Sequence, residues 1–107
     1  MNAPRRRPLD FDRVNAAARP ALLSLLSRWL PGGRLHGCEY AVRNPRRADR
    51  RPGSFLINVR TGAWADFATG DKGGDPISLA AYLAGISQVE AAERMAEMFG
   101  IDARHGQ

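Results

Sequence analysis

Cysteine and histidine are scarce in this chain, which has one cysteine and two histidines among its 107 residues. A single thiol excludes an intramolecular disulfide. A structural zinc site needs two spaced pairs of Cys or His ligands, and His36 with Cys38 is one poor pair without a second. We therefore expect no metal and no other cofactor, and we expect Cys38 to be a small packed side chain.

Residue patterns that support catalysis are missing as well. A hydrolytic triad has only His36 and His105 to draw on, and His105 lies close to the end of the sequence. Asp66, Asp71 and Asp75 are near one another, but turns and a helix cap account for all three. The sequence predicts a protein that is not an enzyme and has no catalytic residues.

Long apolar runs are also absent. No stretch approaches the roughly 18 apolar residues that a membrane span requires. The arginine-rich start is not followed by the apolar core of a signal peptide, so we expect a cytoplasmic protein. The hydrophobic content of 44% indicates a folded chain, and 107 residues correspond to one small domain with a thin core.

Lysine is nearly absent, because fifteen of the sixteen basic residues are arginine, and the net charge is +5. Five arginines crowd into nine residues that contain one acid, Asp49: they are Arg43, Arg46, Arg47, Arg50 and Arg51. A solvated loop in an arginine-rich protein is one interpretation. The other is a phosphate-binding surface, since binding to a nucleic-acid backbone requires local positive charge.

Hydrophobic periodicity predicts helices at both ends of the domain. Residues 10–30 read as helix interrupted at Pro20, with Asp10 as the N-cap and an apolar stripe of Leu22, Leu25, Leu26 and Trp29. A second helical region begins after Asp75 with Pro76 in the first turn, and ends at Gly85. A third opens with the capping box Ser87–Glu90 and closes at Gly100. Its core-facing residues are predicted to be Val89, Ala92, Ala96 and Phe99.

Alternating residues predict strands in the middle of the chain, at 38–43, 54–60 and 63–68. The turn near Thr61–Gly62 leaves two registers open. A two-residue turn places Trp64 beside Val59. A three-residue turn places Ala65 and Phe67 on the inner face and Trp64 outward beside Arg60. The second register has the cleaner apolar face, and we prefer it.

These elements predict an α+β fold in which a small antiparallel sheet is flanked by an N-terminal helix and two C-terminal helices. Residues 1–9 are predicted to be a disordered basic arm, 10–101 a single domain with a core segment at 36–75, and 102–107 a tail. One core is expected to contain Leu26, Phe55, Ile57, Val59, Phe67, Ile77, Ala81, Ala92 and Phe99.

Two motifs bracket the predicted hairpin: Asn44-Pro45-Arg46-Arg47 with Pro52 and Ser54-Phe55 before it, and Trp64-Ala65-Asp66-Phe67-Ala68-Thr69-Gly70-Asp71-Lys72-Gly73-Gly74-Asp75 after it. Together with the following helices, residues 36–101 resemble the N-terminal zinc-ribbon domain of bacterial and phage DNA primases. That family reads Cys-Pro-x-His, then Pro-Ser-Phe, a hairpin, and Cys-x-x-Cys-Gly-x-Gly-Gly-Asp. The chain resembles more closely the metal-free versions found in mobile-element and phage primase-helicase proteins.

The resemblance implies that the four metal-ligand positions are occupied here by Asn44, Arg47, Phe67 and Gly70, which cannot bind zinc. Packing and hydrogen bonds must then replace the metal. We expect Phe67 to fill the vacated space, and Asn44, Asp66 or Asp71 to hold the turns. The glycines of this motif are expected to let the backbone turn sharply.

The resemblance also implies a role in DNA replication, as a module that contacts single-stranded DNA template while a separate catalytic domain makes the primer. In that hypothesis the arginines follow phosphates and Trp64, with Tyr40 as a second candidate, stacks on bases. The predicted nucleic-acid-binding residues are Arg43, Arg46, Arg47, Arg50, Arg51, Arg60, Trp64 and Lys72. The alternative is an adaptor that docks a polymerase, primase or helicase domain of the same replicon without binding DNA.

Overall fold

The computed structural model describes residues 7–46 and 54–105, and it confirms the α+β class. The helices are α1 (Phe11–Ala18), α2 (Leu22–Trp29), α3 (Pro76–Ala84) and α4 (Gln88–Phe99), with a 3-10 turn at Arg19–Ala21 between the first two. The strands are β1 (Arg34–His36), β2 (Glu39–Val42), β3 (Phe55–Asn58), β4 (Trp64–Asp66) and β5 (Lys72–Gly73). None of the helices in the described parts of the chain is long and apolar enough to cross a membrane.

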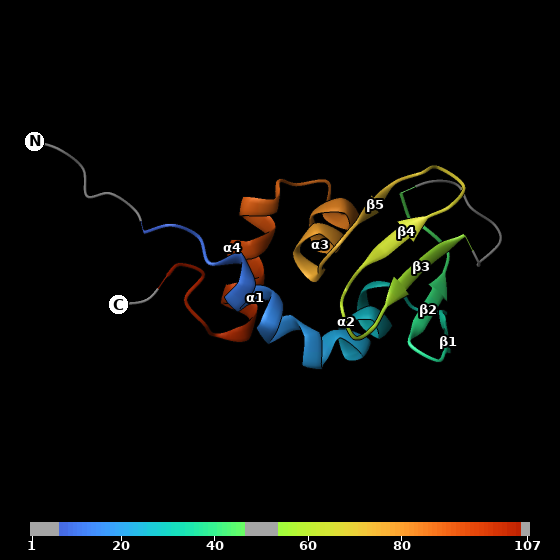
Figure 1. Cartoon of the computed structure of the whole chain (residues 1–107), viewed down its shortest axis with the longest axis horizontal. Coiled ribbons are helices and arrows are strands. Elements are labelled where there is room, and N and C mark those ends of the chain that lie inside the picture. Colours follow the sequence, from blue (N-terminus) through green and yellow to red (C-terminus); the bar gives the residue numbers. More distant parts are fainter. Residues whose placement is uncertain (1–6, 47–53, 106–107) are drawn as a thin grey trace, which may run out of the picture.

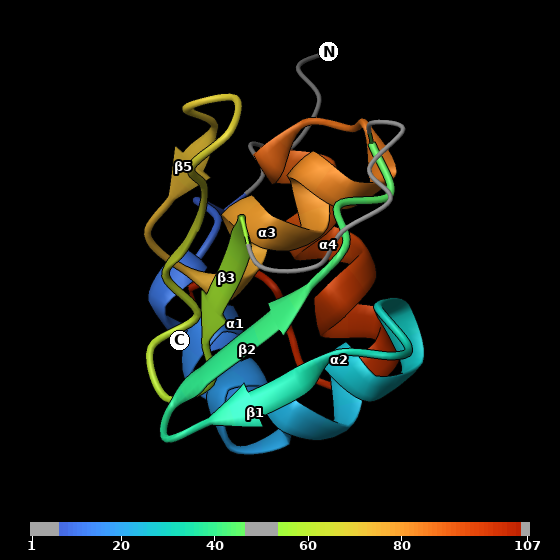
Figure 2. The same ribbon diagram turned by 90° about the vertical axis from the view of Figure 1, so that its right-hand side faces the viewer.

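The five strands form one antiparallel meander in the order β1-β2-β3-β4-β5. The helices α2 and α3 pack on one face of this sheet, and α1 and α4 pack against α3 farther from the strands (Figures 1 and 2). The edge strand β1 was not predicted. It pairs with β2, and His36 lies opposite Glu39, so the two strands are joined by a two-residue turn. Gly37 adopts the positive φ of 61° that such a turn requires.

The predicted helix boundaries are confirmed by their caps. Asp10 accepts a hydrogen bond from the N–H of Arg13 at the start of α1, and Asp75 accepts one from the N–H of Ser78 at the start of α3. Ser87 caps α4 in the same way. Gly85 and Gly100 end α3 and α4 in the left-handed conformation.

Apolar side chains form two clusters that share α3, whereas the sequence predicted one core. The first joins α2 and the sheet to Leu79 of α3: Leu22, Leu26, Leu30, Tyr40, Val42, Phe55, Ile57, Trp64 and Leu79. The second joins α1, α3 and α4: Val14, Ala18, Ile77, Ala81, Ala91, Ala92, Met95 and Ala96. Phe99 packs at the rim of the second cluster, while the expected core residues Phe67 and Val89 are exposed.

Neither predicted register of the β3–β4 hairpin is correct. Trp64 lies opposite Ile57, so Trp64 faces the core and only 6% of its surface is exposed. The connection is longer than expected because the side chain of Asn58 accepts hydrogen bonds from the N–H groups of Arg60 and Thr61, and the N–H of Asn58 bonds to the carbonyl of Ala63. This shift turns Trp64 inward and Phe67 outward, the reverse of the preferred prediction.

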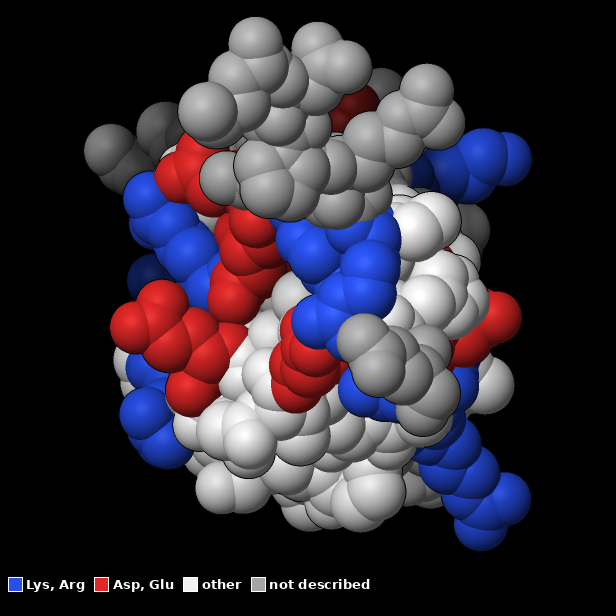
Figure 3. Space-filling view, turned by 90° about the vertical axis from the view of Figure 1, so that its left-hand side faces the viewer, with Lys and Arg blue, Asp and Glu red and all other residues white. Residues whose placement is uncertain are grey.

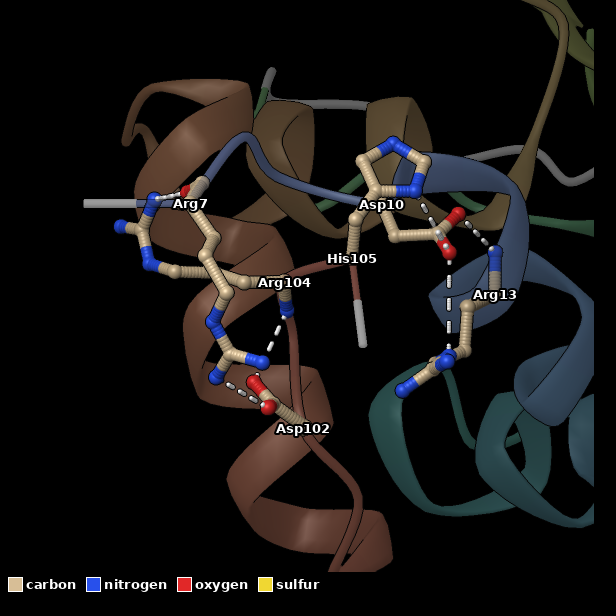
Figure 4. Close-up of polar contacts among 6 residues, drawn as sticks. All are labelled: Arg7, Asp10, Arg13, Asp102, Arg104 and His105. Atoms are coloured by element: carbon tan, nitrogen blue, oxygen red, sulfur yellow. Dashed lines mark hydrogen bonds and ion pairs between the residues drawn. The ribbon is translucent and has the colours of Figure 1, made fainter. Parts of the chain in front are cut away.

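The two ends of the described chain are bound to each other, which corrects the predicted arm and tail for residues 7–9 and 102–105. Leu9 and Arg104 form an antiparallel bridge, and the N–H of Asp10 bonds to the carbonyl of Ala103 at 2.8 Å. Arg7 pairs with Asp102 at 2.7 Å (Figure 4). Figure 4 also shows contacts of His105 and Arg13 with Asp10, of the Arg104 guanidinium with the carbonyl of Arg7, and of the Arg104 N–H with Asp102.

Candidate nucleic-acid interface

The outer face of the sheet carries one continuous row of residues across all five strands. The register pairs Arg34 with Ala41, Ala41 with Leu56, Leu56 with Ala65, and Ala65 with Lys72. The three central side chains are half-buried, and the two outer ones are exposed cations on the edge strands. Because neighbouring strands are about 4.8 Å apart, the four steps place the two cations' backbones about 19 Å apart with an uncharged surface between them.

Phe67 continues this outer face at the end of β4. Its N–H donates to the carbonyl of Ser54 at 2.8 Å, so the ladder between β3 and β4 extends to this residue. Asp66 faces inward and Ala65 outward, and alternation therefore places the ring of Phe67 on the side of Ala65. Its exposed fraction is 73%, the highest among the exposed large hydrophobic residues of the described chain. An aromatic ring in this position is available for contact with a ligand.

The predicted cations are only partly brought together. Arg43 follows β2 at the end of the sheet that carries Phe55 and Ser54, and it is exposed. Arg60 is also exposed but lies in the β3–β4 loop, at the opposite end of the sheet. Lys72 lies on the far edge strand. The predicted sites Arg47, Arg50 and Arg51 lie outside the described residues.

Arg46 is engaged with its own chain. Its Nη1 donates to the carbonyl of Tyr82 at 2.8 Å, and the guanidinium lies 5.2 Å from the centre of the Tyr82 ring. A cation over an aromatic face at this distance is stabilising. Arg46 therefore ties the segment after β2 to α3, so its removal would disturb structure as well as charge.

Ion pairs are distributed unevenly over the described parts of the chain. Residues 19–46 contain five arginines and one acid, Glu39: the arginines are Arg19, Arg28, Arg34, Arg43 and Arg46. Within the described ranges, none of these five forms an ion pair, and neither do Arg60 and Lys72. The end of the molecule that carries the termini instead shows acidic and basic side chains next to one another (Figure 3). Its arginines are paired with acids, as Arg7 with Asp102, Arg13 with Asp10, Arg94 with Glu90 and Arg104 with Glu93.

A buried polar network lies directly behind this outer face. Asn44 is 1% exposed and Asp66 is fully buried, and the Nδ2 of Asn44 donates to Oδ2 of Asp66 at 2.9 Å. The same Nδ2 donates to the hydroxyl of Tyr82 at 2.8 Å, and that hydroxyl donates to Oδ2 of Asp71 at 2.8 Å. The network joins the end of β2, the β4–β5 hairpin and α3. The predicted turn-holding hydrogen bonds are confirmed for Asn44 and Asp66, which accept from the N–H groups of Arg46 and Ala68. The side chain of Asp71 bonds instead to Tyr82, a member of the network that sequence reasoning missed.

Three of the four proposed ligand positions meet at Asp66. Asn44 bonds to its carboxylate, Phe67 follows it in the chain, and the N–H of Gly70 donates to its carbonyl at 2.8 Å. The second Asp66 oxygen accepts from the N–H of Ala68 at 2.9 Å. The prediction that the Phe67 ring fills the interior between these positions is wrong. The buried side chain of Asp66 lies there with its hydrogen bonds, and the Phe67 ring points outward.

The network holds no arrangement suited to metal binding. Among residues 7–46 and 54–105 there is no group of three or more His, Cys, Asp or Glu side chains that could hold a metal ion. Burial raises the pKa of the Tyr82 phenol, and the hydrogen bond to Asp71 raises it further, although the hydrogen bond from Asn44 acts in the opposite direction. Tyr82 therefore stays protonated and keeps donating to Asp71 at neutral pH.

The two aromatic residues predicted to stack on bases are both structural. Trp64 donates from Nε1 to the hydroxyl of Ser78 at 3.0 Å and packs edge-on against Phe55, with ring centres 6.0 Å apart. Tyr40 is 5% exposed, and its hydroxyl donates to the carbonyl of Leu30 at 2.7 Å. Neither ring is accessible to a base. Sequence reasoning missed Arg34 and the outward position of Phe67, although the Gly37 turn signals the hairpin that contains Arg34.

An apolar groove lies away from this face, between α2, α3 and α4. Its volume is about 470 Å³, and it is lined by Trp29, Pro45, Ala80, Leu83, Ala84, Ile86, Ala91, Arg94, Met95 and Met98. Arg94 is the only charged side chain in that lining. The groove and the outer face of the sheet are therefore chemically different surfaces.

Comparisons with known proteins add no relative. No protein-family model matches the chain, and no curated protein matches it significantly in sequence.

Proposed function

We propose that this protein is a non-catalytic DNA-binding module that contacts single-stranded template on the outer face of its sheet. Primer synthesis would be carried out by a separate primase catalytic domain, acting with the polymerase or helicase of the same replicon. A cytoplasmic location is part of the proposal, because the template is there. The likeness of residues 36–101 to primase zinc-ribbon domains supplies the biological context.

The observation that carries the proposal is the uneven distribution of paired and unpaired cations. Arg34 and Lys72 flank the uncharged row Ala41, Leu56 and Ala65 and have no acidic partner in the described chain. Arginines at the terminal end are neutralised by neighbouring acids. Phosphate binding requires positive charge that is not already compensated, and it makes affinity depend strongly on salt.

Fluorescence anisotropy with a labelled 12-nucleotide oligothymidylate, measured at several salt concentrations, tests the proposal. The double variant Arg34→Ala with Lys72→Ala should weaken binding and reduce the slope of log affinity against log salt by about 1.4, or about 0.7 for each lost phosphate contact. The matched control removes the same number of charges from the terminal end. It combines Arg13→Ala with Arg94→Ala and should leave the slope nearly unchanged.

Two results would overturn the proposal. One is the absence of salt-sensitive binding to single strands by the wild-type protein at low salt. The other is an equal loss of slope in both double variants, which would indicate a general effect of net charge. Either result would favour the adaptor function, with the apolar groove between α2, α3 and α4 as the surface to test against partner proteins.

A further inference from the structure

We infer that Phe67 is the residue on which a base of the bound strand stacks. This inference rests on the proposed function and assigns the contact to a residue that the sequence had placed in the core. Trp64 and Tyr40 are buried and hydrogen-bonded to their own chain. Phe67 is the aromatic side chain that the outer face presents to solvent.

The backbone around Phe67 is held in place by hydrogen bonds, which supports this role. Its backbone is fixed to β3 by the hydrogen bond to Ser54, and the preceding Asp66 is held by the buried network, so the ring projects from a rigid support. The ring contributes very little to the stability of the folded chain, because 73% of its surface is exposed. A single exposed hydrophobic side chain is common and carries no argument by itself. The inference therefore depends on the place of Phe67 on the outer face, next to the row that ends at Lys72.

The charges around Phe67 select the class of ligand. Ala65 joins it to the row that ends at Lys72, and Arg43 extends β2 on the other side of Ser54. Neither cation has an acidic partner in the described chain. An aromatic ring near two cations that have no acidic partner in the described chain suits a flexible strand, whose bases stack on the ring while its phosphates approach the cations. The acid next to Lys72 in sequence, Asp71, is held by the Tyr82 hydroxyl. A paired duplex does not offer an unstacked base, so single strands should bind more tightly than duplexes.

The test compares wild type with Phe67→Ala, Phe67→Leu and Phe67→Tyr in the anisotropy assay. Loss of the ring should weaken binding to the 12-nucleotide oligothymidylate by about 5- to 150-fold. Leu keeps an apolar side chain without an aromatic face and should show most of this loss, whereas Tyr should restore binding. The slope of log affinity against log salt should stay the same in all four proteins, because no phosphate contact is removed. Phe11→Ala is the matched control, since Phe11 is an exposed phenylalanine at the start of α1 and should leave affinity unchanged.

An abasic oligonucleotide of the same length separates stacking from an indirect effect. It keeps the phosphates but offers no base, so wild type and Phe67→Ala should bind it equally. Because Phe67 is mostly exposed, thermal unfolding should confirm that every variant is folded. A Phe67→Trp variant gives a direct signal, since stacking should quench its fluorescence more than oligothymidylate quenches the wild-type protein.

The outcomes distinguish this inference from the proposed function. If the wild-type protein fails to bind single strands, the proposed function is wrong and the inference falls with it. If wild type binds with the predicted salt dependence but Phe67→Ala binds equally well, the function stands and the assignment of Phe67 is wrong. The assignment is also wrong if Phe67→Ala weakens binding to the abasic and normal strands by the same factor.

Discussion

Asn44 and Asp66 are 22 positions apart in sequence, yet the Nδ2 of one donates to the Oδ2 of the other at 2.9 Å in the interior of the protein. Both side chains are buried. The Oδ1 of Asn44 also accepts a hydrogen bond from the N–H of Arg46, and the Oδ1 of Asp66 accepts one from the N–H of Ala68. A buried carboxylate is costly unless it is hydrogen-bonded, so this pair fixes the segment after β2 against the β4–β5 hairpin.

Replacing Asn44 with Ala should destabilise the protein by about 1–3 kcal/mol, because it removes a donor to the buried carboxylate of Asp66. Urea unfolding followed by circular dichroism would measure this change. Asn44→Asp should cost more, since it sets a second carboxylate beside Asp66. An unchanged unfolding midpoint in both variants would show that the pair does not support the fold.

The raised pKa of Tyr82 predicts a specific dependence on pH. A phenol with a raised pKa in the folded state contributes stability below pH 10, the ordinary pKa of tyrosine, and loses it as the pH rises through the folded pKa. Tyr82→Phe should cost about 1 kcal/mol near pH 8, because two hydrogen bonds are lost. The difference between wild type and variant should shrink above pH 10. Urea unfolding at pH 8, 9, 10 and 11 checks this, and a difference that grows with pH would contradict it.

Gly73 and Gly74 are adjacent but should respond very differently to substitution. A Cβ atom on Gly73 would lie 2.4 Å from both Nε1 of Trp64 and the hydroxyl oxygen of Ser78, whereas one on Gly74 meets nothing within 4 Å. Gly73→Ala should therefore cost about 1–3 kcal/mol through overpacking, and Gly74→Ala should cost little. The unfolding midpoints of the two variants test this directly, and equal effects would mean that the contact with Trp64 does not constrain Gly73.

The purified protein should contain no stoichiometric zinc and should keep its fold in EDTA. Asn44, Phe67 and Gly70 supply no usual zinc ligand, and hydrogen bonds centred on Asp66 hold this region together. Elemental analysis and circular dichroism before and after chelation provide the measurement. About one zinc per chain would contradict the prediction and direct attention to His36 and Cys38.

Local sequence signals predicted the helices well, because helix ends depend on nearby residues. Asp10, Asp75 and Ser87 cap the helices they were expected to cap, and Gly85 and Gly100 end two of them. The same reasoning placed Val89 in the core, but Val89 is exposed. The burial of a helix face depends on which other helices pack against it, and local sequence does not show that. The short strand β1 was missed because three exposed residues show no alternation of polar and apolar side chains.

The sequence by itself determined the fold class, the caps, the excess of arginine and the polar residues available at Asn44, Asp66 and Asp71, since each of these is a local or compositional property. Tertiary structure alone decided that Trp64 faces inward and Phe67 outward. The turn bonds of Asn58 and the packing of Trp64 against Phe55 and Ser78 are found together in that register, and a strand that shifts by one residue exchanges its two faces. Folding also decided that Arg7 and Arg104 are neutralised, because their acids, Asp102 and Glu93, are not adjacent to them in sequence. The pairs of Arg13 with Asp10 and of Arg94 with Glu90 are local. Charge compensation and burial depend on contacts between distant residues, and only the folded chain makes those contacts.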